Sequence, residues 1–265
     1  MDKKSNANKN KNLFTIGEIA KLIGITRKII LNYEAKGLIK PDVKDGQAGN
    51  RYYTIDTFTQ IRTIRVFQTL GLSLDEIRDY FNDTADLQTL IKRLEIMRDE
   101  LNLNIERLYE RAKKTSNNIT EISVDAQTVF CRTYHSLTVS EKSTVLRETA
   151  LEAMQLYGTD TTKRMYFTEY MLENPEEVTY GIAVPPESEG AHIVHIPGFR
   201  AVAVFYHGAY TELPTVREDL IAYAKEKGME ISGKCRHVYV EGPPQHKDVK
   251  KFITQVLLPI EEMKK

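Results

Sequence analysis

The chain has 265 residues, of which 41% are hydrophobic and 28% are charged, an ordinary composition for a globular protein with room for two modest domains. No apolar run approaches the roughly 20 residues of a membrane helix, so we expect no membrane partner. The formal net charge is zero, but residues 1–70 hold 13 basic and 6 acidic side chains (net +7), whereas residues 119–265 hold 16 and 21 (net −5), which places the attraction for a polyanion in the N-terminal part.

Residues 1–12 are polar, rich in Asn and Lys, and lack an apolar signal core. We therefore expect a disordered tail and a cytoplasmic protein. The two cysteines, Cys131 and Cys235, lie far apart and form no CxxC or Cys/His cluster, which argues against a structural zinc site or a disulfide scaffold. We predict no metal site and no cofactor.

The next region predicts two short helices separated by a glycine turn. Thr15 is a candidate N-cap with Glu18 three residues later, and Gly24 ends the first helix. Thr26 begins a second helix whose apolar side chains face the first. This second helix is the candidate reader of a DNA major groove. Its candidate contact residues are Thr26, Arg27, Lys28, Asn32 and Tyr33.

A hairpin is predicted to follow. Lys40-Pro41 stops helical structure, and the glycine-containing residues 45–49 connect two short extended pieces, the second at residues 51–53. Such a wing would place Arg51 and Tyr52 beside the phosphate backbone, and Arg65 of the following helix is a further candidate for a backbone contact. The open alternative is a small helical core without a role in DNA binding.

Five segments of this region resemble the DNA-binding domain of the MerR family of transcriptional regulators. In order, they are Ile16-Gly17-Glu18, Tyr33, Lys40-Pro41, Arg51-Tyr52-Tyr53 and Gly71-Leu72-Ser73-Leu74-Asp75-Glu76-Ile77. The second helix departs from the family pattern, because it has Ile30-Leu31-Asn32-Tyr33 where the family usually has Leu-Arg-Tyr-Tyr. The resemblance implies a regulator that distorts promoter DNA with an over-long spacer so that RNA polymerase engages. No cysteine precedes Lys114, which disfavours the metal-sensing branch of the family.

Residues 86–114 contain neither Pro nor Gly and predict one long helix. Its apolar side chains recur at alternating steps of three and four, which is a heptad stripe. A helix of roughly 43 Å is too long to bury against one small domain, so we expect the same helix of a second chain as its partner in a homodimer. The alternative is an intramolecular helical hairpin. The stripe consists of Leu87, Leu90 or Ile91, Leu94, Met97, Leu101, Ile105, Leu108 and Ala112.

After a polar linker at residues 115–118, the chain changes to short runs rich in Val, Tyr and Phe, and a strand-helix-strand-strand unit is predicted twice. The first unit uses residues 129–136, 141–157, 163–172 and 178–186, and the second uses 199–208, 213–227, 235–244 and 252–260. Such a repeat predicts an antiparallel sheet, or a pair of sheets, with helices packed on it and a groove where the halves meet. Ligands favour such interfaces.

The repeat is similar to the GyrI-like effector-binding domain, in particular from Gly198 to Ile260, and the whole resembles the multidrug-responsive BmrR branch of the MerR family. The resemblance implies a site for hydrophobic, commonly cationic aromatic compounds, with aromatic side chains and one buried Glu. His237 stands at the position of that Glu, and strand alternation places it on one face with Tyr239. Glu169 is a candidate replacement, unless the strand turns it into solvent. The candidate ligand-binding residues are Phe167, Glu169, Phe205, His237, Tyr239 and Phe252.

The sequence thus predicts a multidomain α and α+β protein: a tail (1–12), a winged helix-turn-helix DNA-binding domain (13–82), a dimerisation coiled coil with linker (83–118) and a GyrI-like effector-binding domain (119–265). We expect a homodimeric, ligand-responsive activator whose partners are promoter DNA, RNA polymerase and a hydrophobic aromatic effector. No catalytic motif is present, and we predict that the protein is not an enzyme. The alternative is a protein that sequesters small molecules, or a GyrI-like hydrolase, in which DNA binding is secondary.

Overall fold

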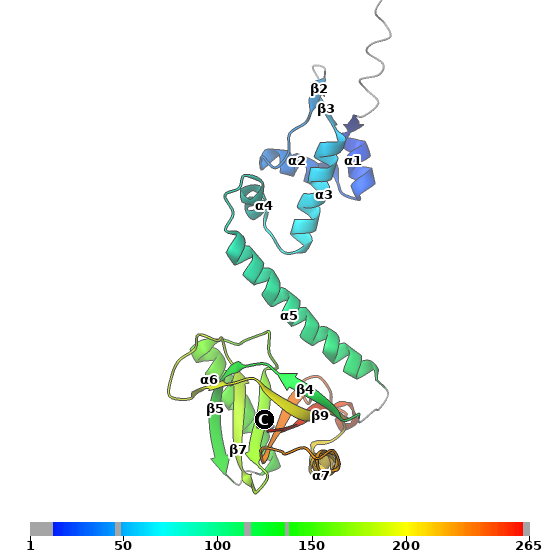
Figure 1. The fold of residues 1–265 in the computed structure, drawn as a ribbon. Helices are drawn as coiled ribbons and strands as arrows, with labels where there is room; N and C mark the ends of the chain where they lie inside the picture. Colours follow the sequence, from blue (N-terminus) through cyan, green and yellow to red (C-terminus); the bar gives the residue numbers. More distant parts are fainter. Residues whose placement is uncertain (1–12, 46–48, 114–117, 136–137, 262–265) are drawn as a thin grey trace, which may run out of the picture. The chain divides into compact units, whose positions relative to one another are not determined.

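The computed structural model describes residues 13–45, 49–113, 118–135 and 138–261. The chain divides into two compact units, Met1–Leu94 and Glu95–Lys265, and each is considered by itself (Figure 1). The expected tail at residues 1–12 lies outside the described residues, as do residues 46–48 of the hairpin turn and most of the expected linker.

The first unit is a small helical domain with a three-stranded sheet in the order β1-β3-β2. Its elements are β1 (Phe14–Thr15), α1 (Ile16–Ile23), α2 (Arg27–Ala35), β2 (Val43–Asp45), β3 (Asn50–Tyr53), α3 (Ile55–Thr69) and α4 (Leu74–Phe81). One core holds them together, and Ile19, Ile30, Tyr53 and Ile61 in it are completely buried. The predicted winged helix-turn-helix is confirmed.

Local capping explains why these helices begin and end where they do. Thr15 and Glu18 form a reciprocal capping box at the start of α1, and Gly24 ends that helix with a left-handed φ of 74°. The Thr26 side chain accepts the first hydrogen bond of α2 from the Ile29 amide. The angle between the two helices is therefore determined within a few residues of sequence.

The predicted long helix is confirmed as α5 (Leu87–Ala112), with 26 residues. Large apolar side chains remain exposed along it, which is the expected stripe: Leu87, Ile91, Met97, Leu101, Ile105 and Leu108 are each at least 40% exposed. Of the expected stripe, Leu90 instead packs against the core of the first unit.

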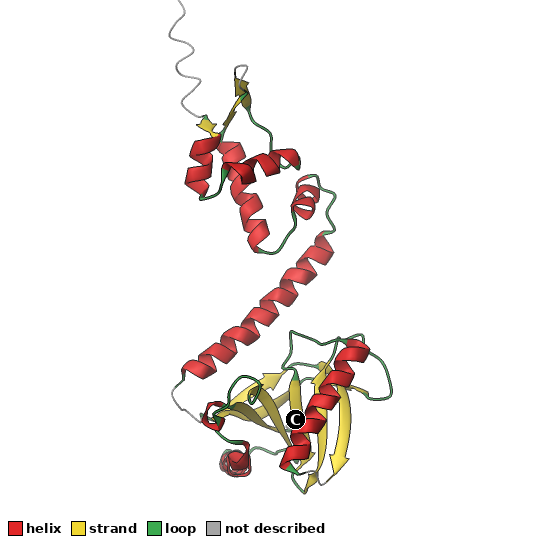
Figure 2. Cartoon of the chain, turned by 180° about the vertical axis from the view of Figure 1, so that it is seen from behind, coloured by secondary structure: helices red, strands yellow, loops and turns green. Residues whose placement is uncertain are grey.

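The second unit contains one antiparallel sheet with helices packed on it (Figure 2). The sheet has eight strands in the order β4-β9-β11-β10-β6-β7-β5-β8. Its strands are β4 (Thr120–Val124), β5 (Gln127–His135), β6 (Tyr166–Met171), β7 (Asn174–Ala183), β8 (Ile193–Ile196), β9 (Phe199–His207), β10 (Lys234–Glu241) and β11 (Ile253–Pro259). The helices are α6 (Val139–Tyr157), α7 (Leu213–Glu226), and the short η1 (Tyr210–Glu212) and η2 (Val249–Lys251). The predicted duplication is present, and its two halves join where β6 pairs with β10.

Both long helices of this unit lie on the same face of the sheet. Tyr166 packs with α6 and Tyr170 packs with α7, and the two tyrosines lie on the same side of β6. The opposite face has its own core, which includes Phe167 and Val238. The outermost strands β4 and β8 were not predicted, because they have only five and four residues.

Candidate functional site

A cavity of about 830 Å³ lies on the helix-covered face of the sheet, where the two halves meet. Its walls come from α6, β6, β7, η1, the start of α7, β10 and the loop after β10. The lining is largely apolar and aromatic, as in most small-molecule sites. The rings on it belong to Tyr166, Tyr170, Tyr180, Tyr210, Tyr239 and Phe252, together with the imidazole of His237.

Two cross-strand groups form the floor of this cavity. The Tyr170 hydroxyl lies 3.4 Å from His237 Nε2, and the two rings meet edge to face at 5.4 Å. The Thr168 hydroxyl lies 3.1 Å from the Tyr239 hydroxyl, and the Tyr239 ring packs edge to face on Tyr210. The expected side-by-side arrangement of His237 and Tyr239 on one face is therefore present, and Phe252 joins them through Tyr210 at 5.1 Å.

Burial keeps the floor uncharged. His237 is 8% exposed, and burial, with the positive charges of Arg217 and Lys142, lowers its pKa to about 4. Burial also raises the pKa of Tyr180 to about 12, and the Tyr180 hydroxyl has no hydrogen-bond partner among the described residues. At neutral pH the floor therefore offers a neutral imidazole and an unused hydroxyl donor.

Three expected site residues do not line the cavity, and this corrects the sequence prediction. Phe167 belongs to the core on the opposite face, and neither Glu169 nor Phe205 lines the cavity. Glu169 Oε2 accepts from the buried Arg236, at 2.9 Å from Nε and 2.7 Å from the terminal nitrogen, while Oε1 accepts from Lys234 at 3.1 Å. The strand does not turn Glu169 into solvent or into the cavity, because these cations on β10 hold it.

The cavity lies on the opposite face of β6 from the one predicted, and most of its lining residues were not predicted. The alternation of Tyr166, Thr168 and Tyr170 was the available signal, since three side chains with hydroxyl groups on one strand face are unusual for a closed core. Three basic residues of the lining were also missed: Lys142 and Arg147 on α6, and Arg217 on α7.

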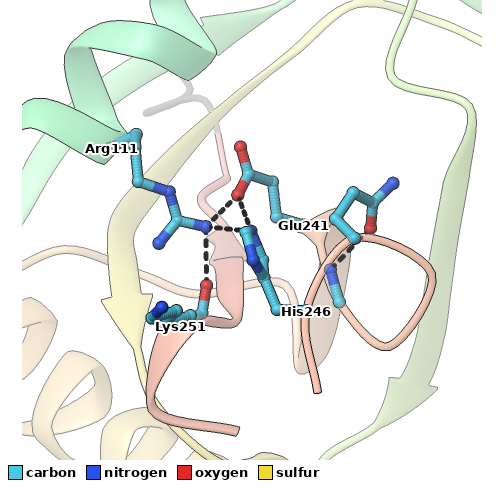
Figure 3. A network of polar contacts seen from close by, with 6 residues as sticks. Arg111, Glu241, His246 and Lys251 are labelled. Atoms are coloured by element: carbon cyan, nitrogen blue, oxygen red, sulfur yellow. Dashed lines mark hydrogen bonds and ion pairs between the residues drawn. The ribbon is translucent and has the colours of Figure 1, made fainter. Parts of the chain in front are cut away.

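One carboxylate of the lining belongs to a polar network that includes the end of α5 (Figure 3). Arg111 of α5 donates to the Glu241 carboxylate and, at 2.7 Å, to the Lys251 carbonyl oxygen. The His246 ring nitrogen lies 2.6 Å from both Arg111 and Glu241. The cavity wall and the long helix thus share one network within the second unit.

In the first unit, α2 presents most of its expected contact residues to solvent. Thr26, Arg27, Lys28 and Asn32 are exposed. Tyr33 is 1% exposed, and its hydroxyl donates to Gln68 at 2.6 Å. The expectation that Tyr33 reads DNA is therefore corrected, because its ring belongs to the core of the domain.

The wing residues are partly engaged within the domain. Arg51 Nε donates to Glu34 at 2.9 Å, and the Arg51 side chain remains 38% exposed. Tyr52 is half-buried, and Arg65 donates to Gln68 at 3.3 Å. Their contacts with DNA stay predictions.

Within the described ranges, no group of three or more His, Cys, Asp and Glu side chains could hold a metal ion. The described helices also include none that is long and apolar enough to span a bilayer.

Comparisons with known proteins match both units. Residues 14–84 match the MerR HTH family regulatory protein family, and residues 99–261 match the GyrI-like small molecule binding domain. The Multidrug-efflux transporter 2 regulator of Bacillus subtilis (strain 168) is 35% identical over 26% of this chain. The matched segment spans only 24% of that relative's own length. The HTH-type transcriptional regulator CueR of Escherichia coli O6:H1 is 31% identical over 32% of this chain and 76% of CueR. The C-terminal domain of EcmrR shares the fold, with a TM-score of 0.50 and 19% identity over 55% of this chain and 98% of that domain.

Proposed function

Because the chain belongs to the MerR family of transcriptional regulators and carries a GyrI-like small-molecule-binding domain, we propose that it is a ligand-responsive transcriptional activator. A hydrophobic aromatic compound is the effector in this proposal. The observation that carries it is the cavity of about 830 Å³, lined by aromatic rings, in the same chain as a helix-turn-helix whose second helix is exposed. The Bacillus relative's role as a regulator of a multidrug-efflux transporter supports this choice of effector class.

In this proposal, α5 joins two copies of the chain. The exposed apolar stripe supports this, because six large side chains along one helix are costly to leave in water. A twofold dimer would present two copies of α2 to a pseudo-palindromic promoter site in the cytoplasm. Arg27, Lys28 and Asn32 would face the groove, Arg51 and Tyr52 would lie at the backbone, and Arg65 would add a backbone contact.

The polar network in Figure 3 supports a response to the ligand. Glu241 lines the cavity and is held by Arg111 of α5, so a ligand that displaces the loop after β10 would change what holds the end of α5. Distortion of the promoter and engagement of RNA polymerase would follow, as the family membership suggests.

The test is in vitro transcription from the DNA upstream of the protein's own coding region, with purified chain, bacterial RNA polymerase and a panel of aromatic compounds. We expect sequence-specific binding without a compound and more transcript with a bound one. The Leu94→Lys, Leu101→Lys double variant should sediment as a monomer and lose specific binding, because it would bury charge in the seam. Ligand binding without any change in transcription would favour a sequestering role instead.

A further inference from the structure

We propose that the cavity selects a hydrophobic anion, an aromatic body that carries a carboxylate or a comparably acidic group. This inference rests on the proposed effector function and specifies the chemistry of its ligand. It follows from where the charged groups around the cavity lie and from which of them already have partners.

The cavity offers nothing that balances a cation at its floor. His237 is neutral at pH 7, since its pKa lies near 4. Glu169 lies outside the lining and has both oxygens engaged, with Arg236 and Lys234. A buried cation would therefore remain unpaired there, which is costly.

Glu241 is the one carboxylate among the described residues of the lining. It is engaged by Arg111 and lies 2.6 Å from His246. A ligand cation would have to compete with the Arg111 guanidinium for this carboxylate. Glu241 is therefore a poor counter-ion for a ligand.

Cationic side chains, in contrast, are available around the same cavity. Lys142 and Arg147 are exposed residues of α6 on the cavity lining, and the ion pairs of the described part of the chain include neither. Arg217 lies on α7 with its side chain 21% exposed, and its one ion pair among the described residues is with the exposed Glu218 beside it on the helix, at 3.6 Å. Its guanidinium also hydrogen-bonds with Tyr170 of the cavity floor, which leaves further N–H donors for a ligand. Three cations and one engaged carboxylate give the lining an excess of positive charge.

The floor also offers a donor that an anion would satisfy. Tyr180 lines the cavity, and its hydroxyl is buried and has no hydrogen-bond partner among the described residues. A carboxylate oxygen accepts such a hydrogen bond, whereas a quaternary ammonium group cannot. Aliphatic side chains of Leu146, Met154 and Val178 complete the walls for the apolar body of the ligand.

The test is calorimetric titration of the full chain with three probes on one ring system: 2-naphthoate, 2-naphthamide and trimethyl(2-naphthylmethyl)ammonium. Benzene and anthracene counterparts cover smaller and larger bodies. We expect the anion to bind at least about tenfold more tightly than the amide, in the range of a charge-assisted hydrogen bond, and the cation to bind most weakly.

Arg217→Gln should lower the affinity for the anion about tenfold and change that for the amide less than twofold. Lys142→Gln and Arg147→Gln, at exposed positions, should each lower it a few-fold without affecting the fold. Arg200→Gln is the matched control, because Arg200 is an exposed arginine on β9 that is paired with Glu121 and absent from the lining. It should leave all three affinities unchanged.

A cation that binds as tightly as the anion would overturn the inference. The inference would also be overturned if Arg217→Gln lowered the affinities for the anion and the amide equally and neither Lys142→Gln nor Arg147→Gln changed the affinity for the anion. If a probe binds and raises transcription without any preference for negative charge, this inference fails and the proposed function stands. If no probe of any ring size binds, both fail.

Discussion

The two halves of the C-terminal sheet have the same order of elements, but their helices are packed in different ways. Helix α7 buries Leu213, Val216 and Leu220 against the sheet, each 7% exposed or less. Helix α6 buries mainly the small Ala150 and Ala153, while its Leu151 remains 57% exposed. One half of the duplication is therefore closed by large side chains, and the other is left partly open.

This difference suggests different roles for the two helices, one in stabilising the domain and the other in lining the cavity. Most of the helical lining of the cavity comes from α6, whereas α7 contributes only its first turns. A helix packed through alanines gains little burial energy per residue, so it can shift to fit a ligand at small cost. We infer that α7 anchors the domain and that α6 is its adaptable wall.

The largest effect should come from Leu220→Ala, because this side chain of α7 is completely buried against the sheet. We expect the free energy of unfolding to fall by about 3 kcal/mol, within the usual range for a leucine truncated in a core. The matched variant Leu151→Ala on α6 should change it by less than about 0.5 kcal/mol and instead weaken binding of naphthyl probes. Urea unfolding followed by circular dichroism measures the unfolding free energy of each variant, and calorimetric titration measures the binding of the probes. Equal losses for the two variants would remove the distinction between anchor and wall.

The second effect concerns pH at the junction of the two halves. His237 contacts Tyr170 and lies 3.5 Å from the Cys235 sulfur in the α7 core. Its pKa in the folded protein, about 4, lies below the ordinary value of 6.5, so the folded state binds fewer protons than the unfolded state. The contribution of His237 to the free energy of unfolding should be fully present above pH 6.5. It should decrease as the pH falls toward 4, with a loss of about 2 kcal/mol at pH 5.

Urea unfolding of the parent and of His237→Gln between pH 7 and pH 4 tests this. The difference in unfolding free energy between the two proteins should change with pH as the titration of one imidazole requires, because all the other titratable groups are present in both proteins. Parallel pH profiles would show that His237 is already solvated and that the floor is not closed by the α7 side.

The parts of this molecule that the sequence predicted correctly are those that short segments determine. Thr15, Thr26 and Gly24 mark the ends of α1 and α2 through bonds that span three to five residues. The heptad stripe of α5 is equally local. The large apolar side chains that remain exposed along α5 are ones that recur at helical spacing in the sequence.

The sequence predicted a cavity where the two halves meet, but it did not predict most of the lining residues. The identity of these residues depends on pairing between strands that are distant in the sequence. Glu169 is held away from the cavity by its pairing with Arg236, which lies 67 residues away; the hydroxyl groups on the other face of β6 indicate the cavity side but do not identify this partner. Tyr33 shows the same limit in the first unit, since its ring is buried among residues of other elements and its hydroxyl donates to Gln68 of α3. His237 and Tyr239 were placed correctly because strand alternation alone puts them on one face.

The smallest effect should come from Thr138→Ala at the start of α6. Thr138 and Glu141 form a reciprocal capping box, so this substitution removes an acceptor for the Glu141 amide. The typical loss of about 1 kcal/mol should appear as roughly fivefold faster hydrogen exchange of α6 amides. Amides of α7 should exchange at the parent rate, because α6 opens without unfolding the sheet. Thr138→Ser, which keeps the hydroxyl acceptor, is the matched control and should exchange as the parent does. If α6 and α7 accelerate together, the two helices open only through global unfolding. A ligand could then not move α6 alone, and the adaptable wall would have to be sought at the end of β10 and in the loop that follows it, where Glu241, the last residue of β10, connects the cavity to Arg111.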